Sequence, residues 1–141
     1  MKMKSAIILA AAILCAAACG GNEHDEFRRA LRHQYLMMEE FTAAVNQAGT
    51  PEEIVAALEE FRREAVAGRE WMVRLTTEHP ALADLEKTAL PEEARAELAR
   101  MEEATPRFVE AMLRVEREFG EDPAVRRALD ELGPALSTPD R

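Results

Sequence analysis

Apolar residues recur at alternating intervals of four and three along most of this chain, and that spacing restricts it to helices packed along one face. The first run predicts a helix over residues 23–48, with the core face Phe27, Leu31, Gln34, Met38, Phe41, Val45 and Ala48. The second run predicts a helix over residues 51–78, with the core face Ile54, Leu58, Phe61, Ala65, Gly68, Met72 and Leu75. Because only Gly49 and Thr50 join the two, we expect an antiparallel hairpin.

Helix-capping residues mark the ends of these runs. Thr50, Pro51 and Glu53 combine an N-cap, a proline at the first helical position and the acidic partner of a capping box. Gly49 is expected to end the first helix as a left-handed cap. Pro80 limits the second helix to about residue 78.

Two further helices complete the expected fold. The third should cover residues 91–119, with the core face Ala94, Leu98, Met101, Thr105, Phe108, Met112, Val115 and Phe119. The phase survives Pro106, which favours a kink in one helix over a break at Thr105. Asp122 and Pro123 should start a short fourth helix, closed by Gly133 and Pro134. The prediction is an all-α antiparallel bundle of three long helices and a short C-terminal one, a single domain over 23–133 with a disordered tail at 134–141.

The segment before this domain has the composition of an export signal. Lys2 and Lys4 precede an apolar run over residues 5–18 that contains no charge. As a helix that run would reach only ~21 Å, which is shorter than the ~30 Å hydrocarbon core of a bilayer. A cleaved signal peptide over residues 1–18 is therefore favoured over a permanent transmembrane helix.

Small residues then precede a cysteine, in the order Ala16, Ala17, Ala18, Cys19. This resembles the lipobox of bacterial lipoproteins, in which the cysteine is acylated and becomes the first residue of the mature chain. The resemblance implies a lipid on Cys19 and attachment to the membrane through it. The alternative is an ordinary Ala-x-Ala cleavage site, which would leave Cys19 as a free thiol.

The residues after Cys19 bear on where such a lipoprotein would reside. In that family an Asp directly after the cysteine favours retention in the inner membrane, and here the position holds Gly20. The resemblance therefore implies the outer membrane, on its periplasmic face. Residues 19–22 would form a short flexible tether. The full chain has a net charge of −9, so we expect no binding to nucleic acid.

Residues that could carry catalysis are sparse. Outside the leader the only serine is Ser137, in the expected tail, and the only cysteine is Cys19. The histidines lack the spacing of metal or haem motifs, and His33 falls on the expected solvent side of its helix. We therefore predict that the protein is not an enzyme and carries no metal or other cofactor.

Methionines supply the one candidate for a ligand site. Met38, Met72, Met101 and Met112 all fall on expected core faces, with Met37 alongside. They are core filler in the simplest interpretation and a pocket lining in the other. Gly68 should admit a neighbouring helix or ring, with Trp71 the natural candidate, and Gln34 should set helix register or mark a polar pocket. The candidate ligand-lining residues are Gln34, Met38, Gly68, Met72, Met101 and Met112.

Two functions remain open. Junctions such as His79-Pro80-Ala81-Leu82 and Asp122-Pro123-Ala124-Val125 resemble those of small uncharacterised helical lipoproteins, a likeness that implies no activity. The first hypothesis is a non-catalytic adaptor that binds an envelope protein, with a contact patch of Val66, Val73 and Leu113. The alternative is a carrier for a small apolar ligand or cofactor in a methionine-lined core, near Gly68, Thr105 and Pro106.

Overall fold

The computed structural model describes residues 22–83 and 90–137, and within them every regular element is a helix. The elements are α2 (Asn22–Gln47), α3 (Pro51–Glu78), the 3-10 turn η1 (Pro80–Leu82), α4 (Glu92–Phe119) and α5 (Pro123–Leu136). The all-helical prediction is therefore confirmed for these residues. The leader, Cys19 and the last four residues lie outside the described part.

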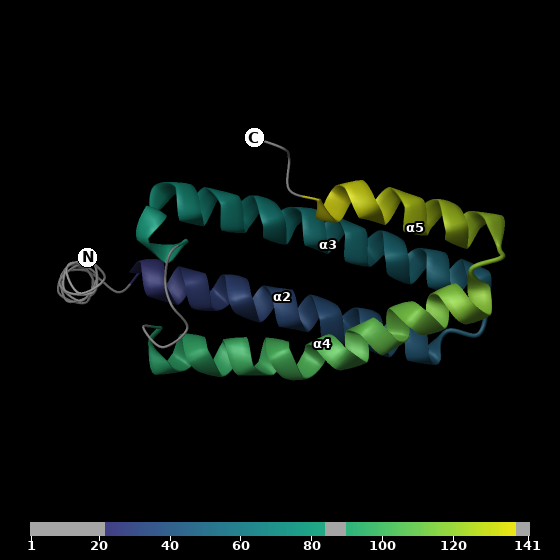
Figure 1. Cartoon of the computed structure of the whole chain (residues 1–141), viewed down its shortest axis with the longest axis horizontal. Coiled ribbons are helices and arrows are strands. Elements are labelled where there is room, and N and C mark those ends of the chain that lie inside the picture. The colour runs from purple at the N-terminus through teal and green to yellow at the C-terminus, as the bar shows by residue number, and fades with distance from the viewer. Residues whose placement is uncertain (1–21, 84–89, 138–141) are drawn as a thin grey trace, which may run out of the picture.

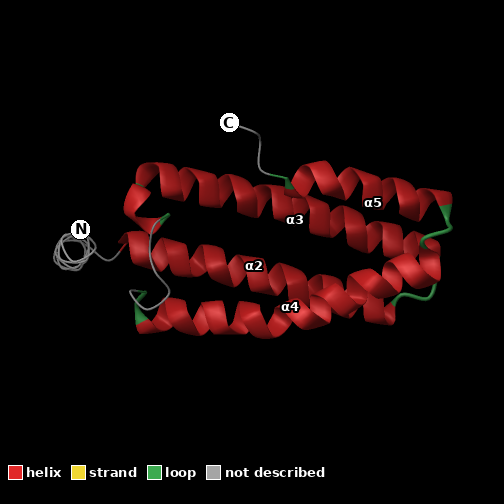
Figure 2. Ribbon diagram, in the orientation of Figure 1, coloured by secondary structure: helices red, strands yellow, loops and turns green. Residues whose placement is uncertain are grey.

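The helices lie side by side in the order α4, α2, α3, α5 (Figure 1). Each helix runs opposite to the one before it along the chain, so α2 and α4 point the same way. Helix α2 packs extensively on both α3 and α4, whereas α3 and α4 approach each other little. Among the described residues, Figure 2 shows helices and loops and no strand. The central helix of the bundle is therefore α2, and α5 packs mainly on α3.

The predicted helix starts are confirmed. Thr50 Oγ1 accepts from the Glu53 amide, and Glu53 Oε2 accepts from the amide of Thr50, which completes the capping box of α3. Asp122 caps α5 by accepting from the amides of Ala124 and Val125 at 2.9 and 3.1 Å. The predicted left-handed cap at Gly49 is wrong, because its φ lies outside the left-handed region. Its amide instead donates to Glu53 Oε2 at 2.7 Å.

Helix α5 continues past the predicted stop at Gly133 and Pro134, so residues 134–136 are helical rather than a disordered tail. A hydrogen-bond network at its C-terminus explains the extension. Arg69 Nη1, on α3, donates to the carbonyls of Ala135 and Ser137 at 2.8 and 2.7 Å. These bonds satisfy carbonyls that have no partner within the helix. The last turn of α5 is thereby attached to the middle of α3.

Pro106 lies inside α4, which is continuous from Glu92 to Phe119. The prediction of one helix rather than two is confirmed. Figure 1 shows that α4 bends near its middle. A proline without an amide hydrogen accounts for such a bend, since it removes one bond of the helical ladder.

The buried side chains form two clusters. One contains residues of all four helices and is named the covered half: Phe41, Val45, Ala48, Ile54, Ala57, Leu58, Phe61, Ala65, Ala111, Val115, Val125, Ala128 and Leu132. The other contains none from α5 and is named the open half: Phe27, Ala30, Leu31, Leu75, Leu82, Leu90 and Ala94. The connection between α3 and α4 contributes Leu82, as predicted, while Leu85 lies outside the described residues.

The predicted core face of α4 needs a correction. Thr105 is exposed and donates to the Met101 carbonyl, while Ala104 beside it is buried. Glu97 and Ala111 are also buried on this helix. Small residues permit close approach of two helix backbones, and α4 packs most extensively on α2. The larger side chains of α4 consequently flank that contact.

Candidate ligand-binding site

An apolar pocket of about 390 Å³ lies beside the C-terminal end of α5, between α2, α3 and α4. We name it the methionine pocket. Its lining residues are Gln34, Met37, Met38, Ala65, Gly68, Arg69, Met72, Val73, Thr76, Met101, Ala135 and Leu136. The volume falls within the ~300–1,000 Å³ range of small-molecule sites.

The structure brings together most of the ligand-lining residues expected from the sequence. Gln34, Met38, Gly68, Met72 and Met101 all line the methionine pocket. Met112 does not, because it packs against the covered half. Met37 joins the lining, and so do Arg69 and the end of α5. Sequence reasoning missed these last two because it ended α5 at Gly133.

The pocket arises from unequal helix lengths. Helix α3 has 28 residues and α5 has 14, so α5 covers only part of α3. Beyond the end of α5, Met72 and Val73 of α3 line the space that no further turn of α5 fills. Val73 and Leu136 also line the pocket and remain 48% and 49% exposed. The space is therefore concave, apolar and open to solvent.

Gly68 admits a ring, as predicted, but that ring is His33 and not Trp71. A Cβ on Gly68 would lie 3.0 Å from His33 Cδ2. The His33 Nε2 atom is 3.3 Å from the Glu64 carbonyl and 3.7 Å from Glu64 Oε2. Trp71 instead donates from Nε1 to Glu26 Oε1 at 3.1 Å. The prediction of a solvated His33 is only partly right: its side chain is 27% exposed, because the missing side chain at position 68 lets the ring pack against α3.

Polar groups in the methionine pocket are few. Arg69 is the single charged side chain of the lining. Gln34 is half-buried, and Thr76 Oγ1 donates to the Met72 carbonyl at 2.9 Å. The lining therefore offers one positive charge and one amide to a ligand, against four thioethers.

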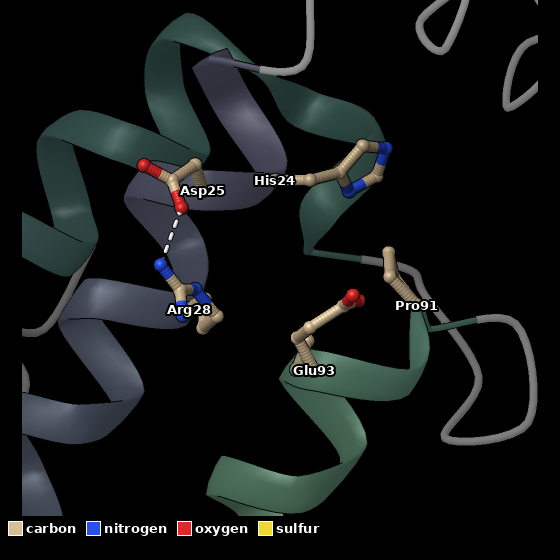
Figure 3. Close-up of a pocket in the computed structure, with 6 residues that line it drawn as sticks. His24, Asp25, Arg28, Pro91 and Glu93 are labelled. Carbon is tan, nitrogen blue, oxygen red and sulfur yellow. Dashed lines mark hydrogen bonds and ion pairs between the residues drawn. The ribbon is translucent and has the colours of Figure 1, made fainter.

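A second, polar pocket of about 350 Å³ lies between the first turns of α2 and α4. His24 and Glu93 extend into this region from different helices, while Arg28 is paired with Asp25 at 2.7 Å (Figure 3). The His24 Nδ1 atom is buried without a hydrogen-bond partner. Within the described residues, no group of three or more His, Cys, Asp or Glu side chains could hold a metal ion.

One buried carboxylate lies between α2 and α4. Glu97 is 5% exposed, and its Oε2 lies 3.5 Å from Arg100 Nη1 without the geometry of a hydrogen bond. Arg100 donates to the Tyr35 hydroxyl at 3.4 Å. That bond, with a smaller contribution from Glu97, raises the pKa of Arg100 above its ordinary value. The cluster is a fixed-charge contact between helices, since Arg100 is protonated at any physiological pH.

Cys19 lies outside the described residues, three positions before α2 begins at Asn22. Val66, Val73 and Leu113 do not form one patch of like exposure: Val66 is half-buried and Val73 belongs to the methionine pocket.

None of the helices in 22–83 and 90–137 has the length and apolar character needed to cross a membrane. Comparison with known proteins gave no match to a family model, a curated protein or a solved structure.

Proposed function

We propose that this chain is a lipid-anchored lipoprotein of the outer membrane, facing the periplasm as an antiparallel bundle of three long helices and one short helix. The lipobox-like run before Cys19 supports the anchor. Because α2 starts at Asn22, a lipid on Cys19 would attach at the end of the bundle that holds the polar pocket. Two or more acyl chains make such attachment stable.

The intact mass of the mature protein tests the anchor. The proposal expects a chain that starts at Cys19 and carries a diacylglyceryl group, recovered with outer-membrane fractions. An unmodified Cys19 thiol, or cleavage at another residue, would refute the lipoprotein assignment. Recovery with the inner membrane would overturn the localisation alone.

The geometry best supports a non-catalytic carrier of a small apolar ligand, held in the methionine pocket. One observation carries this proposal: five of the six residues expected to line a site converge on one apolar pocket that is open to solvent. Methionine side chains suit such a site, since they are flexible and polarizable and adapt to ligands of different shape. The unequal lengths of α3 and α5 leave that space unfilled.

Photolabelling of the full chain in isolated membranes tests the carrier function. The probe is a neutral alkyl diazirine, and the labelled peptides are mapped by mass spectrometry. We expect label on peptides that contain Met38, Met72 or Met101. Met101→Trp should fill the pocket and remove the label, whereas Leu113→Trp, a similar change at an exposed position of α4, should not. Label spread over all helices alike, unaffected by Met101→Trp, would refute the proposal.

An adaptor that binds an envelope protein is the second candidate function. Val109 and Leu113 favour it, because they lie one turn apart on α4 and are 47% and 54% exposed. Crosslinking in cells from a photoreactive residue at position 109 should then capture a protein partner. A crosslink yield no higher than that from position 127 on α5, also exposed, would remove this candidate.

A further inference from the structure

The methionine pocket combines an apolar lining with one cation, and that combination selects a class of ligand. We propose that it binds a long-chain carboxylate, with the hydrocarbon chain among the methionines and the carboxylate on the Arg69 guanidinium. This inference rests on the proposed carrier function and names its ligand. Its supports are the position of Arg69 and the apolar character of the lining.

Arg69 is placed to receive an anion. It is half-buried, lines the pocket and is held by its bonds to the carbonyls of Ala135 and Ser137. Both bonds start from Nη1, and a guanidinium carries further donors on Nη2 and Nε. Carboxylates accept charge-assisted hydrogen bonds from that planar group, about twice as strong as neutral ones.

The rest of the lining suits a flexible hydrocarbon chain. Four methionines from three helices surround the space: Met37, Met38, Met72 and Met101. The half-exposed Val73 and Leu136 extend the apolar lining toward solvent. An aliphatic chain gains by leaving water in proportion to its buried area, at about 25 cal/mol per Å².

The net charge of the chain disfavours anions in general, so the hydrocarbon chain must supply much of the binding free energy. At −9 overall, the protein repels free anions at a distance, and Arg69 is a single positive charge. A carboxylate with a short chain therefore gains too little to bind. The proposal expects acetate and butanoate to leave the pocket empty, and dodecanoate to fill it.

Binding should also affect the end of α5. A carboxylate on the Nη2 and Nε donors of Arg69 brings negative charge to a helix C-terminus, beside the carbonyls of Ala135 and Ser137. This added negative charge loosens the last turn. Amide hydrogen exchange at residues 134–137 should therefore be faster with dodecanoate bound than without it.

The test uses two photoreactive probes on the full chain in membranes: dodecanoate with a diazirine in its chain, and the methyl ester of the same compound. For the wild-type protein we expect about tenfold more label in the pocket from the carboxylate, the size of one charge-assisted hydrogen bond. Arg69→Gln should make the two probes equal, and Arg69→Lys should keep part of the preference.

Arg62→Gln is the matched control. Arg62 also lies on α3 and also ties it to α5, through Glu131 at 3.1 Å, but it does not line the pocket. The control therefore removes the same charge and a similar tie while leaving Arg69 in place. Its preference for the carboxylate should equal that of the wild-type protein.

Three results would overturn the inference. Equal labelling of the wild-type pocket by both probes would mean a neutral ligand, and the carrier function would stand. If Arg69→Gln and Arg62→Gln reduced the preference for the carboxylate probe equally, that preference would come from the net charge or from the attachment of α5, and not from Arg69 itself. Absence of pocket label from either probe would refute both the inference and the carrier function.

Discussion

The covered and open halves of the bundle solve the same packing problem with different side chains. In the covered half the rings of Phe41, Phe61 and Phe108 contact one another at centroid distances of 5.0–5.4 Å, and α5 closes the cluster. The open half has no residue from α5. It relies on half-buried Trp71 and Met72 around a smaller cluster of fully buried residues.

The difference teaches where a helical bundle can hold a ligand. A fourth helix over the whole of α3 would bury the face that contains Met72 and Val73. Because α5 stops at Leu136, that face stays accessible at the boundary between the halves. The methionine pocket is therefore a consequence of one short helix.

The largest expected effect is in the covered half. Phe61→Ala should lower the free energy of unfolding by about 3–5 kcal/mol, because Phe61 is buried and contacts both other rings of the cluster. Met72→Ala should lower the free energy of unfolding by less, since Met72 already borders an open space. Urea denaturation of both variants measures the comparison. Equal losses would mean that the two halves are packed alike.

The N-cap of α5 gives the second-largest expected effect on stability. Asp122→Ala removes the side chain that accepts from two amides at the start of α5, and should cost about 1 kcal/mol. Asp130→Ala, at an exposed position of the same helix, should change stability by less than about 0.5 kcal/mol. Thermal unfolding of the two variants tests the cap. A smaller loss for Asp122→Ala than for Asp130→Ala would contradict it.

A double-mutant cycle tests the contact between His33 and Gly68. Gly68→Ala should raise the free energy of unfolding by up to about 1 kcal/mol, because alanine has a higher helix propensity than glycine. In the wild-type background that gain is offset, because the new Cβ meets the His33 ring at 3.0 Å. In a His33→Ala background the full gain should appear, so the two changes should couple by about 1 kcal/mol. Additive effects would mean that the ring moves away without cost.

The smallest effect concerns the buried carboxylate. Glu97→Gln removes a buried charge that is paired imperfectly with Arg100, so stability should stay the same or rise by up to about 1 kcal/mol. Glu103→Gln, at an exposed position of α4, is the control and should have no effect. A clear loss of stability in denaturant titration of Glu97→Gln would show that the Glu97–Arg100 ion pair within α4 stabilises the protein.

The sequence predicted the helices well because their signals are local. The capping residues Thr50 and Asp122 act within one turn, and the four-and-three spacing placed Phe41, Phe61 and Val115 correctly in the core. The prediction was wrong on α4, where the heptad pattern selected Thr105 and the structure buries Ala104. Large apolar side chains are the signal by which a core face is recognised in a sequence. Where two helices approach closely, however, the buried positions favour small residues.

The candidate site could be predicted only in part. Gln34, Met38 and Met101 could be recognised because they are polar or flexible residues on the predicted core faces. The core face of a helix can be predicted from the spacing of residues within that helix alone. The roles of Arg69 and His33 were not, because they depend on contacts between distant segments: Arg69 with the end of α5, and His33 with Gly68. No local pattern encodes such contacts.

Native mass spectrometry of the mature protein, released from lipid nanodiscs, tests the central claim most directly. If the boundary between the covered and open halves is a ligand site, the wild-type protein should carry one non-covalent adduct of low mass per chain. The Met101→Trp variant should lack that adduct, and Leu113→Trp should keep it. A wild-type protein that is empty, or an adduct that survives Met101→Trp, would contradict the claim.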